Sequence, residues 1–135
     1  MIEIDLLQFE RLSSSLEDLR ESGLNGREIL TFAAELAKND SENTFGTGTS
    51  TDGSSWLESQ RAINNGGTTL VETGRLRNSI QIAVDDELAN IGTNVEYGKY
   101  HQNGTRNLPQ RAFLGIEDES VEAVIDRIER MIEDA

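Results

Sequence analysis

The sequence has no cysteine, so disulfide bonds, thiolate metal sites and cysteine nucleophiles are excluded. It also lacks any apolar run close to the roughly 18 residues that a membrane-spanning helix needs. Its first residues, MIEIDLLQFERL, carry acidic side chains where a secretory signal peptide carries basic ones. We therefore expect a soluble protein that is not exported by the general route and does not bind membranes.

Basic residues are scarce. The chain has only two lysines, and its 25 acidic residues outnumber its 12 basic ones, which gives a formal net charge of −13. The middle is more balanced than the ends: residues 41–115 contain 8 acidic and 6 basic residues, whereas residues 116–135 contain 8 and 2. No acidic residue lies between Tyr97 and Gly115. A surface this acidic should repel duplex DNA and anionic lipids.

The chain is short enough to form a single domain over residues 1–135. At its start, Ile2 and Ile4 alternate with polar residues, which predicts a short strand. Apolar residues at spacings of three and four then predict two amphipathic helices, over about residues 5–21 and 27–38. Together these helices should form a helical hairpin.

The stretch 41–55 is rich in glycine and short polar residues, so we expect it to be a long flexible loop that orders on contact with a neighbour or remains a disordered spacer. Trp56 should anchor this loop on the core through its large apolar area. The glycines match no phosphate-binding pattern and no lysine follows them. A helical segment over about 57–63 and a break at NNGGT, residues 64–68, should follow.

The chain is organised around residues 70–115, which contain the clearest hairpin signal. Thr73 and Gly74 should start a turn or helix. After it, the alternating apolar residues Ile80, Ile82 and Val84 predict a strand with one face in the core. Three acidic residues, 85–87, then supply a turn into a partner strand over residues 88–93. Carboxylates at consecutive positions of a turn point apart. The three acidic residues therefore favour a solvated turn over a metal site.

A short helix should precede a strand or extended segment at 111–116, and an amphipathic helix should close the chain over 117–134, capped by Asp118 or Ser120. The predicted fold class is therefore α+β: a small antiparallel sheet with a central hairpin, packed against an N-terminal helical pair and a C-terminal amphipathic helix. His101 lacks a second histidine or a carboxylate at ligand spacing, which favours a structural hydrogen-bonding role. With no combination of nucleophile and base, we expect no enzyme activity, no cofactor and no metal.

Several stretches occur in an order that resembles a known family. They are Phe45, Gly53 and Trp56, then LVETGRLRNSI at 70–80, IGTNVEYGKYHQNG at 91–104 and LPQRAFLGIED at 108–118. This order resembles the phage virion morphogenesis family of tail-completion proteins, of the gpS and Mu gpG type, over nearly the whole chain. The chain departs from the family's pattern at five positions: Gly98, Tyr100, Asn103, Gln110 and Ala112.

The resemblance implies a non-catalytic structural protein of a tailed virus. It implies a tail-completion or tail-terminator subunit that forms a homo-oligomeric ring at the head–tail junction, caps the tail tube and contacts the tail-tube protein and the neck or head-completion proteins. Viral DNA would pass through the ring without specific binding, and the protein would be in the host cytoplasm during assembly and then in the tail or neck of the virion. A head-side connector or stopper is an alternative within this class. A small acidic module that caps a basic partner is an alternative outside it.

Arginine and aromatic residues, which are enriched at protein interfaces, cluster in and before the run 97–115. We expect them to contact the acidic face of the last helix in a neighbouring subunit or to anchor the loop, while internal salt bridges are the alternative for Arg106 and Arg111. Arg75 and Arg77 should also fix the turn before the hairpin. The interface candidates are Arg75, Arg77, Tyr97, Tyr100, His101, Arg106, Arg111 and Phe113.

Overall fold

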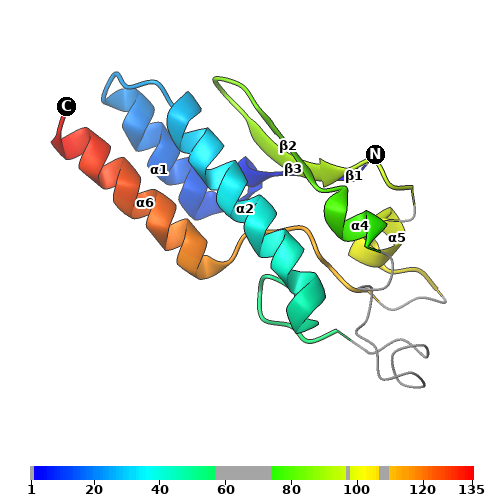
Figure 1. Ribbon diagram of the computed structural model, residues 1–135. Helices are drawn as coiled ribbons and strands as arrows, with labels where there is room; N and C mark the ends of the chain where they lie inside the picture. The colour runs from blue at the N-terminus through cyan, green and yellow to red at the C-terminus, as the bar shows by residue number, and fades with distance from the viewer. Residues whose placement is uncertain (1, 57–73, 97, 107–109) are drawn as a thin grey trace.

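The computed structural model describes residues 2–56, 74–96, 98–106 and 110–135 (Figure 1). The elements follow one another in the order β1 (Ile2–Asp5), the 3-10 helix η1 (Leu6–Gln8), α1 (Glu10–Glu21), α2 (Arg27–Thr47), α4 (Arg75–Asn78), β2 (Gln81–Val84), β3 (Ala89–Thr93), α5 (Gly98–Asn103) and α6 (Asp118–Glu133).

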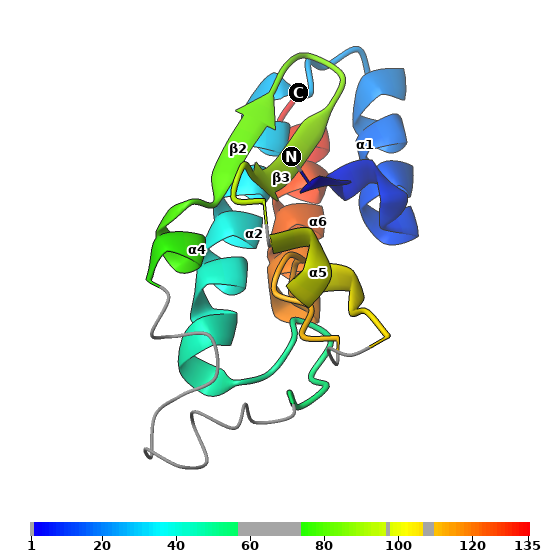
Figure 2. The same cartoon turned by 90° about the vertical axis from the view of Figure 1, so that its right-hand side faces the viewer.

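The strands form a three-stranded antiparallel sheet in the order β1-β3-β2. Ile4, Ile91 and Ile82 are aligned across the three strands, and Ile91 at the centre is fully buried. This alignment places one apolar row on the face that packs against α2. Figure 2 looks onto the opposite face, with α2 and α6 behind the sheet.

The long helices α1, α2 and α6 pack beside one another, with α6 contacting both α1 and α2. Each contributes an apolar stripe at helical spacing, such as Leu12, Leu16 and Leu19 on α1. The α+β class and the hairpin are therefore confirmed. Of the predicted helical partners, α2 packs against β2 and β3, whereas α1 packs with α6, and α6 packs with α1 and α2. The first helix begins later than its pattern predicts, because Asp5 accepts a hydrogen bond from the Leu7 N–H at 2.9 Å and a 3-10 turn precedes α1.

The expectation of a flexible loop over 41–55 is wrong for its first part, since α2 continues to Thr47. Ser41, Thr44 and Phe45 extend the buried stripe of Ala37 at helical spacing, and all three are buried. Burial therefore overrides the weak helix propensity of small polar residues. The helix ends where Gly48 adopts a φ of 69°, a left-handed conformation that suits glycine.

The loop that follows is short and held in place. Thr49 and Ser55 form an isolated antiparallel bridge. The backbone N–H of Trp56 donates to the Gly48 carbonyl at 2.8 Å. Trp56 is 8% exposed, so its predicted role as an anchor is confirmed. The predicted helix at 57–63, the break at 64–68 and Thr73 lie outside the described residues.

Near the C-terminus, the strand alternative for residues 111–116 is excluded and the predicted cap of the last helix is wrong. Residues 111–116 form no strand and instead run as irregular chain into α6. The helix α6 is capped by neither Asp118 nor Ser120, because its N-cap residue is Glu117 and no side chain of that residue caps it. The Glu117 N–H donates instead to Asp40 on α2 at 3.0 Å. A side chain from another helix thus fixes the start of α6.

Candidate functional site

The centre of the candidate site is the irregular segment 110–117, which Gln102 of α5 clamps from one side. The Gln102 amide oxygen accepts hydrogen bonds from the N–H groups of Phe113 at 3.0 Å and Leu114 at 2.9 Å. Its amide nitrogen donates to the Leu114 carbonyl at 3.3 Å. The Gln102 amide therefore forms the hydrogen bonds that a neighbouring strand would otherwise form with this backbone. As a result, these buried N–H and carbonyl groups have partners although the segment is irregular.

Polar groups of α2 hold the same segment from the other side. The buried Ser41 hydroxyl donates to the Gly115 carbonyl and accepts from the Gly115 N–H, both at 3.1 Å. Gly115 also passes close to the loop after α2, because a Cβ at this position would lie 2.2 Å from the Thr51 hydroxyl oxygen. The segment fits there only without a side chain at residue 115.

An aromatic cluster joins the end of α2, the loop after it and this segment. The Phe45 ring lies 5.8 Å from Trp56 and 5.5 Å from Phe113, centroid to centroid. The Trp56 indole N–H donates to the Ser50 hydroxyl at 2.9 Å and to the Ala112 carbonyl at 3.2 Å. Phe113 is fully buried in this cluster, so the structure places it as an anchor of the segment within the subunit.

His101 and Arg111 lie where α5 meets the segment, and the Arg111 N–H donates to the His101 carbonyl at 2.7 Å. Burial, and then the nearby Arg111 charge, lower the pKa of His101 below its usual 6.5. Arg111 is 4% exposed, and its burial lowers the pKa of its guanidinium as well. The surface contact predicted for Arg111 therefore does not fit its position.

The three predicted arginines other than Arg111 lie at the surface. Arg75, Arg77 and Arg106 are exposed, and none of their side chains forms a hydrogen bond or ion pair with another described residue. The internal salt bridge considered for Arg106 is therefore not found among the described residues. The buried Leu76, rather than either arginine, anchors α4, while Tyr97 lies outside the described residues.

Four exposed cations lie on α4, on α5 and just beyond it. The α4 and α5 helices lie next to each other, since a Cβ on Gly98 would be 3.1 Å from the Leu76 side chain. Lys99 lies over the Tyr100 ring, 5.1 Å from its centroid, and Tyr100 is 44% exposed. We call this surface the basic end and define it as Arg75, Arg77, Lys99, Tyr100 and Arg106, with the exposed Glu96 at its border.

Two arginines hold the acidic turn 85–87, one through its backbone carbonyls and one through a carboxylate. Arg20 donates to the carbonyls of Asp86 and Glu87 at 3.1 Å each, and Arg27 pairs with the Asp86 carboxylate at 3.3 Å. Asp85 accepts the Glu87 and Leu88 N–H groups, and these bonds hold the pKa of its carboxyl below the usual range. The acidic turn is thus docked on the α1–α2 end, while most acidic residues of α6 stay exposed.

Sequence reasoning did not identify Asp40, Ser41 or Gln102, which fix the segment most directly. For Ser41 the signal was present, because it lies four residues after Ala37 on the same helical face. For Gln102 there was none, because an amide among polar neighbours has no periodic pattern. Among the described residues, no group of histidine and acidic side chains could hold a metal ion, and no helix has the length and apolar character to cross a membrane.

Comparisons with known proteins place this geometry in context. The sequence model of the phage virion morphogenesis family matches residues 7–133 of the chain. The Mu-like prophage FluMu G protein 1 of Haemophilus influenzae is 28% identical over 110 residues, which cover 75% of this chain and 75% of that protein. No solved structure matches the chain significantly.

Proposed function

Because the chain belongs to the phage virion morphogenesis family and has a structural or assembly role in a phage virion, we propose that it is a tail-completion subunit. In this proposal the subunits form a ring at the head–tail junction that caps the tail tube and joins it to the head. The partners are other copies of the chain, the tail-tube protein and the neck or head-completion proteins. The chain acts by binding and carries out no catalysis.

The observation that carries the proposal is the separation of opposite charges on one subunit. The basic end lies on α4 and α5, whereas α6 runs away from it toward the opposite end of the molecule (Figure 1). When complementary surfaces lie on different sides of a subunit, the contact between copies is heterologous, and it closes into a ring if the rotation allows. The acidic face of α6 in one copy would then meet the basic end of the next.

The overall charge supports a passage for DNA in the same proposal. With a formal charge of −13 per subunit, a ring would repel phosphates rather than retain them. That charge also makes the subunits repel one another, and salt screens this repulsion beyond about 8 Å at physiological ionic strength. Assembly should therefore strengthen as salt rises from low values, as long as the paired surfaces remain in contact.

The test is the mass of the purified protein by light scattering over a series of salt concentrations. We expect a discrete multiple of 14.9 kDa. Arg106→Glu should abolish assembly and leave a folded monomer, whereas Lys38→Glu, which changes the net charge equally from a site on α2, should assemble normally. Arg111→Glu is not a suitable probe, because it would bury a carboxylate and unfold the subunit.

Three results would contradict the proposal. A monomer at every salt concentration would exclude self-assembly and favour the small binding module. Equal effects of Arg106→Glu and Lys38→Glu would mean that net charge, and not the basic end, controls assembly. Appreciable binding of duplex DNA at physiological salt would contradict the passage of DNA without specific contacts.

A further inference from the structure

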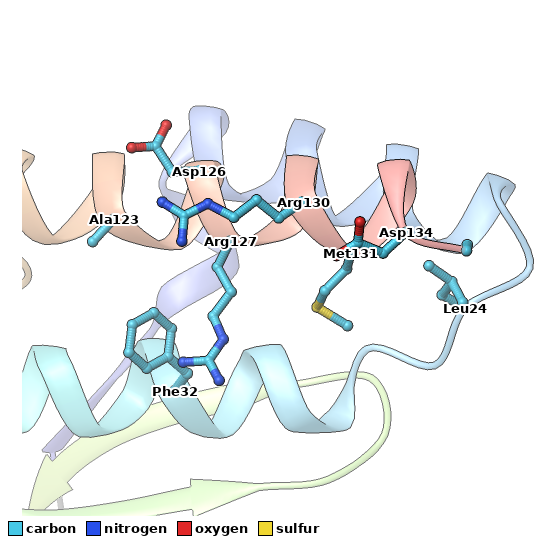
Figure 3. A pocket seen from close by; sticks show the side chains of 9 residues that line it. Leu24, Phe32, Ala123, Asp126, Arg127, Arg130, Met131 and Asp134 are labelled. Atoms are coloured by element: carbon cyan, nitrogen blue, oxygen red, sulfur yellow. The ribbon is translucent and has the colours of Figure 1, made fainter.

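An open groove lies between α2 and α6, at the end of the molecule away from α5 (Figures 1 and 3). It has a volume of about 770 Å³. Phe32 extends from α2, Met131 extends from α6 toward α2, and Leu24 lies at one end of the groove (Figure 3). All three side chains are half-buried and leave apolar surface within the groove.

The charged groups around the groove leave a net negative rim. Arg127, one of the two arginines that line the groove, is already engaged: it lies over the Phe32 ring at 4.6 Å and pairs with Glu28 at 3.9 Å. Arg27, in the adjoining hollow, pairs with Asp86. Of the charged residues that line the groove, Asp126, Asp134 and Arg130 have no ion pair within the described part of the chain. Glu35, in the adjoining hollow, has none there either. The C-terminal end of α6 adds a partial negative charge.

The described surface offers two exposed large hydrophobic side chains that could fill such a groove, Leu88 at 43% and Tyr100 at 44%. Leu88 follows the acidic turn 85–87, so it would bring like charges to the acidic rim. Tyr100 is flanked by Lys99 and belongs to the basic end. A tyrosine beside cations is typical of the anchor residues that dominate protein interfaces.

We propose that Tyr100 of one copy inserts into the groove between α2 and α6 of the next copy. This inference rests on the proposed ring and names its central contact. The aromatic ring enters a hollow that already has apolar walls, while Lys99 and the neighbouring arginines face the acidic rim. Because the anchor and the groove lie at opposite ends of one subunit, each copy uses both, as head-to-tail assembly requires.

The experiment uses the absence of cysteine from the chain. Asn103→Cys and Ala123→Cys are purified separately, mixed under assembly conditions and treated with a short bis-maleimide linker. Asn103 is exposed and lies one turn after Tyr100 on α5, so this variant keeps the proposed anchor. Ala123 is exposed and lines the groove. The matched control replaces Asn103→Cys with Leu88→Cys, which also keeps Tyr100 and stands at an exposed position. Mass spectrometry of the mixed product identifies the two linked chains.

We expect the Asn103→Cys mixture to give several-fold more mixed product than the Leu88→Cys mixture. We also expect Tyr100→Ala to weaken assembly about 30-fold or more, the loss of one interface anchor, and Leu88→Ala to leave it within about 2-fold. Equal yields from the two mixtures, or normal assembly of Tyr100→Ala, would overturn the contact. If unmodified rings form in that case, the proposed function stands and only this contact fails; if no ring forms at any salt, both fail.

Discussion

Replacing Gln102 with alanine removes three hydrogen bonds that hold residues 113 and 114. The N–H groups of Phe113 and Leu114, at 3.0 and 2.9 Å from the amide oxygen, lose their acceptor. Both residues are buried, so water reaches these groups poorly. An unsatisfied buried backbone group costs about 1–3 kcal/mol, and the lost donor to the Leu114 carbonyl adds less.

We therefore expect Gln102→Ala to lower the free energy of unfolding by about 3 kcal/mol, which corresponds to a fall in Tm of about 10 °C for a chain of this size. Gln110→Ala is the matched control. The Gln110 amide is exposed and donates one hydrogen bond to the Gln102 carbonyl at 2.9 Å. Its loss should cost about 0.5 kcal/mol.

The assay is urea unfolding followed by tryptophan fluorescence. Trp56 is the sole tryptophan, and it donates to the Ala112 carbonyl at 3.2 Å, so its emission reports on the clamped segment. Circular dichroism gives the helical signal in the same samples. Equal stability of the Gln102→Ala and Gln110→Ala variants would refute the reasoning, because the clamp would then contribute no more than a surface hydrogen bond.

Two other changes test the surroundings of the clamp. Burial lowers the pKa of His101 below 6.5, so its contribution to stability is present above pH 6.5 and is lost as the pH falls through the folded-state pKa. The Tm should therefore fall more between about pH 7.5 and pH 5.5 in the natural chain than in His101→Gln, and equal falls would contradict the assigned shift. Gly115→Ala should destabilise the subunit by about 1–3 kcal/mol, because the new Cβ would lie 2.2 Å from the Thr51 hydroxyl oxygen. Thr51→Ala in the same chain should recover much of this loss, and a purely additive double variant would exclude the clash as its cause.

The sequence by itself determined the features that depend on local pattern. Apolar spacing located the stripes of α1 and α6, and alternation located β2 and β3, because each regular element must bury one face. Composition excluded cysteine chemistry and membrane-spanning helices in the printed chain. The order of motifs indicated the phage virion morphogenesis family, and the match over residues 7–133 confirms it.

Only the tertiary structure decided the length of α2 and the roles of polar side chains. The composition of 41–47 favours a loop, but packing of Ser41 and Phe45 against the segment 110–117 stabilises a helix there. Likewise, the start of α6 depends on Asp40, which is 77 residues from its partner Glu117. A local pattern cannot contain such pairings, because each group finds its partner only after the chain has folded back on itself.

Tertiary contacts also decided which of the predicted site residues are exposed and which are buried. The sequence grouped Arg106, Arg111 and Phe113 by composition, yet Arg106 is exposed while Arg111 and Phe113 are buried. Their spacing along an irregular segment has no period from which exposure follows. The clamp of Gln102 and Ser41 turns Phe113 inward, and the packing of α5 on α4 leaves Tyr100 outside. Sequence therefore selected the right stretch of chain, and tertiary contacts decided which of its side chains a partner can reach.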